Sequence, residues 1–90
     1  MTVRKVSPTV FTPLDDGTAV VLNVTTLFYY SLNRTGANLW REIEEKKSVE
    51  FGDLIKLTLD RFDVSEHDAT THLTSFITKL AEFRLIETAQ

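Results

Sequence analysis

The stretch that most constrains the fold is residues 27–37, where a strand pattern turns into a helix pattern without an intervening loop. Residues 28–30 are aromatic, and aromatic side chains are enriched in strands. Leu32 ends this run, and Asn33 follows at once with a side chain that can cap a helix. The chain is therefore expected to pass directly from strand to helix, which places the edge of the strand beside whatever that helix packs against.

Three short strands are predicted in the N-terminal third of the chain. Residues 18–23 and 27–32 are rich in β-branched and aromatic side chains, and the short link between them favours an antiparallel hairpin. Residues 10–12 form a shorter candidate strand, closed by Pro13. The Asp-Asp-Gly at 15–17 is typical of a turn, because Asp side chains bond the nearby backbone and Gly accepts a positive φ.

Apolar residues at helical spacing predict three helices in the rest of the chain. The first begins after Asn33 and runs to about Glu45, with Trp40 on its core-facing side. The second begins somewhere between Ser48, which offers a capping side chain, and Asp53, a rival start because Gly52 is a poor helix former.

The third helix is predicted to begin after Ser65, and Asp68 three residues later completes a pattern similar to a capping box. Its apolar stripe is formed by Ala69, Leu73, Phe76, Ile77 and Leu80, and residues 85–86 close the core behind it. The predicted fold class is α+β: a winged helix-turn-helix in which a three-stranded antiparallel sheet is followed by three helices. We expect a single domain over residues 1–90, with residues 1–8 as a flexible tail.

Composition argues against several classes of function. The 90 residues contain no Cys, which excludes disulfides and thiolate metal sites and is compatible with the cytoplasmic location that we expect. No apolar run approaches the roughly 20 residues needed to span a bilayer, so no membrane partner is expected. The formal net charge of −3 argues against a phosphate-binding surface, and hence against nucleic acid as the partner.

No catalytic or metal-binding pattern is apparent. His67 and His72 are five residues apart, whereas a metal-binding pair on one helix face is typically three or four apart. The chain contains no nucleophile elbow, no dinucleotide-binding glycine motif and no P-loop. We therefore expect that the protein is not an enzyme and has no cofactor.

The order and spacing of several segments resemble the PqqD-like family, whose members are also called recognition elements for ribosomally synthesised, post-translationally modified peptides. The resemblance covers roughly residues 8–87, and the segments that carry it are 16–23, 29–40, 54–64, 69–80 and 85–86. It implies a non-catalytic domain that captures the leader segment of a precursor peptide and presents it to a modifying enzyme. That enzyme is expected to be a radical-SAM protein, or a leader protease or cyclase, and the adaptor is expected to be a monomer.

The resemblance also implies that the leader adds as a strand to residues 27–32, in the groove toward the helix at 69–83. The residues expected to contact the leader are Leu27, Phe28, Tyr29, Tyr30, Ser31, Leu73, Phe76, Ile77, Lys79 and Leu80. Two positions depart from the family pattern. His72 stands where an acidic residue is usual, and Arg84 stands where a glycine is usual. The second departure predicts a helix end built without the usual left-handed glycine cap.

Two other functions stay open at this stage. A winged-helix DNA-binding regulator would share the fold class, and a reader of DNA carries Arg and Lys on its recognition helix. The helix at 65–83 has Lys79 as its only full positive charge, against three carboxylates, so the peptide-binding adaptor is favoured. A purely structural subunit is the third interpretation, and identification of its partner would separate it from the other two.

Overall fold

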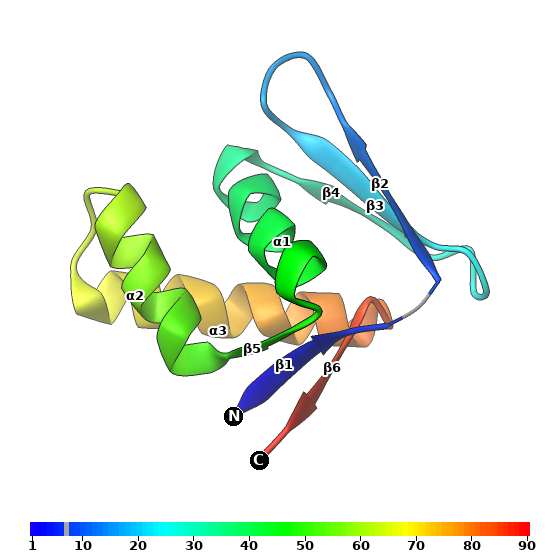
Figure 1. Cartoon of the computed structure of the whole chain (residues 1–90). Coiled ribbons are helices and arrows are strands. Elements are labelled where there is room, and N and C mark those ends of the chain that lie inside the picture. The colour runs from blue at the N-terminus through cyan, green and yellow to red at the C-terminus, as the bar shows by residue number, and fades with distance from the viewer. Residues whose placement is uncertain (7) are drawn as a thin grey trace.

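The direct passage from strand to helix is present in the computed structural model, which describes residues 1–6 and 8–90 (Figure 1). Strand β4, Tyr29–Leu32, ends one residue before helix α1, Arg34–Lys46. The side chain of Asn33 caps the helix, because its Oδ1 accepts a hydrogen bond of 2.8 Å from the backbone N–H of Gly36. The predicted junction is therefore confirmed, with the cap at the predicted residue.

The predicted three-stranded antiparallel sheet is also confirmed. Its strands are β2, Thr9–Pro13, β3, Ala19–Asn23, and β4, in the order β2-β3-β4. Val21 lies opposite Tyr30 in the β3–β4 pair. Every second residue of β3 is buried, which shows that one face of this sheet packs on the core.

A second three-stranded antiparallel sheet was not predicted. It has the order β5-β1-β6, with β1 at Thr2–Lys5, β5 at Ser48–Glu50 and β6 at Ile86–Ala89. Val3 in its central strand is completely buried, opposite Val49 and Thr88. The prediction of a flexible tail is therefore wrong for β1. The part of that prediction that concerns Ser7 lies outside the described residues.

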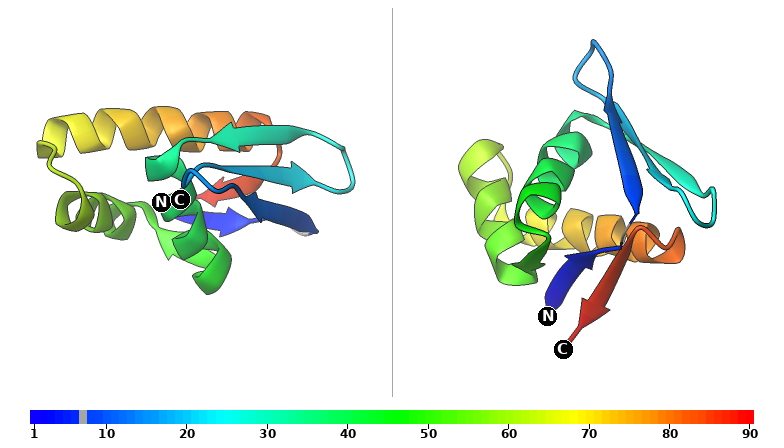
Figure 2. Two further views of the ribbon diagram at one scale, coloured as in Figure 1. Left: turned by 90° about the horizontal axis from the view of Figure 1, so that it is seen from above. Right: turned by 45° about the vertical axis from the view of Figure 1, so that its right-hand side comes forward.

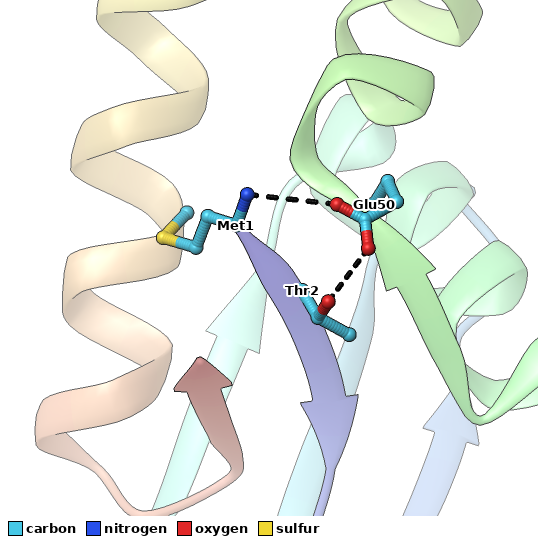
Figure 3. Close-up of polar contacts among 3 residues, drawn as sticks. All are labelled: Met1, Thr2 and Glu50. Carbon is cyan, nitrogen blue, oxygen red and sulfur yellow. Dashed lines mark hydrogen bonds and ion pairs between the residues drawn. The ribbon is translucent and has the colours of Figure 1, made fainter. Parts of the chain in front are cut away.

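The edge strand β5 of the second sheet determines where the second helix begins. Helix α2 spans Phe51–Arg61, and its N-cap residue is Glu50, which makes no capping side-chain hydrogen bond. The helix thus begins inside the predicted range from Ser48 to Asp53, at neither of its ends, because residues 48–50 pair with β1 as a strand. The Glu50 side chain instead contacts the N-terminal end of β1. Its carboxylate accepts a hydrogen bond of 2.6 Å from the Thr2 hydroxyl and lies 3.5 Å from the Met1 amino group (Figure 3).

Helix α3, Glu66–Glu82, begins as predicted, since the Ser65 hydroxyl oxygen accepts a hydrogen bond of 3.1 Å from the N–H of Asp68. In Figure 1 it passes behind α1, and the chain turns at its C-terminal end into β6. Trp40 of α1 is completely buried in the core between these elements, as predicted. None of the described helices has the length and apolar character needed to cross a membrane.

Candidate functional site

Strand β4 forms an open edge of its sheet, since β3 is its one neighbour in the described ladder. In an antiparallel pair, opposed residues alternate between hydrogen-bonded and non-hydrogen-bonded pairs. The N–H of Asn23 donates to the carbonyl oxygen of Phe28 at 2.8 Å, so these two residues form a bonded pair. The register then makes Tyr30 a bonded partner of β3.

The backbone groups of Tyr29 and Ser31 therefore point away from β3, toward the open edge. The hydrogen bonds between β2 and β3 lead independently to the same orientation of Ser31. There the N–H of Leu14 donates to the carbonyl oxygen of Thr18 at 2.8 Å, which directs the backbone groups of Val20 toward β2 rather than toward Ser31. The open edge thus offers two N–H donors and two C=O acceptors at alternate residues.

The two edges of this sheet differ in how they are protected. The β2 edge ends in Pro13, and another proline, Pro8, lies just before the strand. Edge strands are commonly blocked by proline or by charged side chains, which prevent an unwanted strand from pairing. Strand β4 has the sequence Tyr-Tyr-Ser-Leu and carries neither feature. The β4 edge is therefore open to pairing with an extended chain.

An aromatic cluster lies against this edge at the end of α3. The ring of Tyr30 meets the ring of Phe83 edge-on, with centroids 5.2 Å apart, and Phe28 meets it at 6.4 Å. A hollow of about 430 Å³ lies here, lined by Leu27, Phe28, Tyr29, Tyr30, Ser31 and Phe83. The structure thus brings together all five residues of the predicted strand 27–32 that were expected to contact a peptide, although β4 begins at Tyr29 and Leu27 and Phe28 lie before it.

Phe83 is a residue of this site that the sequence analysis did not single out. It is the C-cap residue of α3, three residues after Leu80 and seven after Phe76. A spacing of seven places it on the same side of the helix as Phe76. That spacing could have identified Phe83 from the sequence, but the predicted apolar stripe ended at Leu80.

The five expected helix residues are divided between two sides of α3. Leu73, Ile77 and Leu80 are buried in the core, so their contact with a peptide stays a prediction that their burial does not favour. Phe76 is half-buried and Lys79 is exposed. Because each residue advances about 100° around a helix, Phe76, Lys79 and Phe83 lie on one side of α3 while the other three face inward, and Leu73 also lines the hollow beside Phe76.

Phe76 also lines a second hollow, of about 540 Å³, where the three helices meet. Its walls include Leu39, Phe62, Val64, Ala69 and Leu73, and its polar lining comes from Asn33, Thr35, Thr58 and His72. Gly36 allows α1 to approach α3 closely here, because a Cβ at this position would lie 3.2 Å from Cε1 of Phe76. The site therefore consists of the β4 edge with an apolar hollow near each end.

Arg84 shows how the end of α3 is built. The helix ends without a glycine, as expected, and Arg84 itself adopts the left-handed conformation there, with a φ of +58°. The N–H of Leu85 donates to the Leu80 carbonyl, and that of Arg84 to the Ala81 carbonyl, which is the Schellman pattern. The amide nitrogen Nδ2 of Asn23 donates to the Arg84 carbonyl at 2.7 Å. This bond ties the β3–β4 turn to the helix end beside Phe83.

Comparison with known proteins identifies what this arrangement is similar to. The model of a family described as coenzyme PQQ synthesis protein D (PqqD) matches residues 18–86. Two solved structures share the fold: TbiB1 in complex with the TbiA(beta) leader peptide, 21% identical with a TM-score of 0.83, and lasso peptide synthetase B1 complexed with the leader peptide, 20% identical with a TM-score of 0.77. The first match covers 97% of this chain and 98% of TbiB1, and the second covers 96% and 98%. No curated protein sequence matches.

Proposed function

We propose that this chain, which belongs to the PqqD family, is a non-catalytic adaptor that binds the leader segment of a ribosomally synthesised precursor peptide. The leader adds as a fourth strand to the open edge of β4, and the adaptor presents the rest of the precursor to a modifying enzyme. The observation that carries the proposal is the unprotected β4 edge, on which Tyr29 and Ser31 direct four backbone hydrogen-bonding groups outward. The two structures with the same fold are both complexes with leader peptides.

Backbone pairing alone is too weak to account for stable binding. Four main-chain hydrogen bonds contribute about 2–6 kcal/mol at roughly 0.5–1.5 kcal/mol each, and ordering a flexible peptide costs about 2–5 kcal/mol. Micromolar affinity requires about −8 kcal/mol. Side chains of the leader must therefore supply most of the binding free energy. The hollows beside Phe83 and Phe76 are suited to apolar side chains of that kind.

The charge of α3 disfavours DNA binding. Its one Lys, Lys79, lies 3.7 Å from the carboxylate of Glu82 in an ion pair, and the first turn carries Glu66 and Asp68. A recognition helix that approaches phosphates needs a net positive face. The proposal therefore treats the fold as a peptide-binding module. We further propose that the modifying enzyme is a radical-SAM protein, or a leader protease or cyclase, and that it is located with the adaptor in the cytoplasm.

Substitution of Ser31 by proline tests the proposal. Proline lacks the N–H group, and it is tolerated on edge strands where that group faces solvent. Ser31→Pro is therefore expected to stay folded by circular dichroism and to bind a fluorescent precursor peptide, encoded beside this chain, at least about tenfold more weakly. Tyr30→Pro is expected to unfold or strongly destabilise the domain, because the Tyr30 N–H faces β3.

Ser31→Ala is the matched control, since it removes the hydroxyl and keeps the N–H. It is expected to bind the peptide like the wild type. A folded Ser31→Pro variant with wild-type affinity would show that the β4 edge is not the recognition site.

A further inference from the structure

A surface that adjoins the β4 edge is formed by the β3–β4 turn, which extends past the C-terminal end of α3 (Figure 2) and bonds the Arg84 carbonyl through Asn23. It consists of Val24, Leu27, Phe28 and Arg84, of which Leu27 and Phe28 also line the hollow beside Phe83, and we name it the hairpin-tip surface. The three apolar side chains are 43%, 69% and 48% exposed, respectively, and Arg84 is also exposed. Exposed apolar side chains together with an arginine are a common composition of protein interfaces.

Two residues of the hairpin-tip surface are held in a costly backbone conformation. Leu27 has a φ of +64° and Arg84 a φ of +58°, the left-handed region that Gly or Asn adopts more easily. The Leu27 side chain is mostly exposed, so burial in the core does not repay this cost. The Schellman end of α3 accounts for the conformation of Arg84, whereas strain of the kind seen at Leu27 is found at binding and switch sites and motivates a search for a partner.

The turn is rigid in spite of its strain. The side-chain oxygen of Asn23 accepts hydrogen bonds from the N–H groups of Thr25 and Thr26, at 2.9 and 3.1 Å. The carbonyl of Asn23 accepts from the N–H of Leu27 at 2.8 Å, and its Nδ2 holds the Arg84 carbonyl. Leu27 and Arg84 are therefore presented in one fixed arrangement, which lowers the entropy cost of binding a partner.

The direction of the bound leader connects the hairpin-tip surface to the modifying enzyme. Antiparallel pairing is the more stable and the commoner arrangement. Since β4 runs from Tyr29 to Leu32 toward α1, an antiparallel leader leaves the edge at Tyr29. The part of the precursor that is modified follows the leader, so it emerges beside Leu27. The enzyme that acts on it must then work next to this surface.

We infer that the hairpin-tip surface is the docking site for the modifying enzyme, which meets it with an apolar patch and a carboxylate. This inference rests on the proposed function. The carboxylate is expected because Arg84 takes part in none of the ion pairs found among residues 1–6 and 8–90, while nearby Glu87 is paired with Arg4. An arginine next to apolar side chains forms strong bidentate contacts with a carboxylate once water is excluded.

Arg84→Gly tests the inference without endangering the fold, because glycine suits a φ of +58° better than arginine does. The assay uses the purified precursor peptide and modifying enzyme encoded beside this chain. The variant is expected to bind the precursor like the wild type, while its complex with the precursor binds the enzyme at least about tenfold more weakly. Arg84→Lys is expected to restore part of the affinity for the enzyme, and Val24→Ser to weaken it several-fold.

Lys47→Gly is the matched control, since Lys47 has a φ of +65° and lies at the end of α1, outside the hairpin-tip surface. It also removes one cation and one strained residue, but it should leave the affinity for the enzyme unchanged. Wild-type enzyme binding by both Arg84→Gly and Val24→Ser, with precursor binding intact, would overturn the docking site alone. Failure of the wild-type chain to bind its precursor would instead overturn the proposed function.

Discussion

Asn23→Ala should be among the most damaging polar substitutions in this chain. Asn23 is buried, and its side chain makes three hydrogen bonds: to the Arg84 carbonyl and from the N–H groups of Thr25 and Thr26. It thus holds the β3–β4 turn in shape and joins that turn to the end of α3. Alanine removes all three bonds and leaves their partners without this contact.

The expected loss follows from the number of bonds. At roughly 0.5–1.5 kcal/mol for each bond, the three together contribute about 1.5–4.5 kcal/mol to the free energy of unfolding. A small domain has about 5–15 kcal/mol in total. Each kilocalorie shifts the melting temperature by about 4–8 °C in a domain of roughly 60–100 residues, so a fall of at least about 6 °C is expected.

Urea denaturation followed by circular dichroism would measure this loss. Thr25→Ala is the control, because Thr25 is exposed and contributes its backbone N–H to the network, which alanine retains. That variant should stay within about 0.5 kcal/mol of the wild type, as surface substitutions usually do. The reasoning is refuted if Asn23→Ala is as stable as Thr25→Ala.

Two further predictions concern the core and the response to acid. Trp40→Ala should lower the free energy of unfolding by about 3–5 kcal/mol, because Trp40 is completely buried, and a thermal melt like that of the wild type would contradict its place in the core. The Thr18 hydroxyl and N–H bonds to Asp16 hold the pKa of that carboxyl below its usual 3.8, so the stability they contribute is present above this pH and is lost as the pH falls through the folded-state pKa. Thr18→Val should raise the Asp16 pKa toward 3.8 in an NMR titration, and an unchanged value would rule out the hydroxyl as its main cause.

Much of the local structure could be read from the sequence because local interactions determine it. The caps at Asn33 and Ser65 each depend on one side chain and a backbone N–H three residues later. The helical period identified the core side of α1, including Trp40. The strand order β2-β3-β4 followed from short links between neighbouring strands, and the family resemblance pointed to β4 as the binding strand.

The second sheet could not be read in the same way. Strand β1 pairs with β5 and β6, so Val3 lies opposite Val49 and Thr88, residues far away in the sequence. Four residues such as Thr-Val-Arg-Lys show too little alternation to distinguish a strand from a tail. The same pairing placed residues 48–50 in a strand, although Ser48 there offers a helix-capping side chain.

The candidate site likewise has features that the local sequence determines and features that depend on tertiary packing. The sequence by itself determined that an uncharged aromatic strand precedes α1, and that α3 carries an apolar stripe. The tertiary structure decided that Leu73, Ile77 and Leu80 fill the core, while Phe76 and Phe83 reach the groove. It also decided that the backbone of Ser31, rather than that of Tyr30, faces the open edge. These outcomes depend on how α3 is rotated against the sheet and on which β3 residue each β4 residue meets, and both are set by packing between elements rather than by the sequence within any one of them.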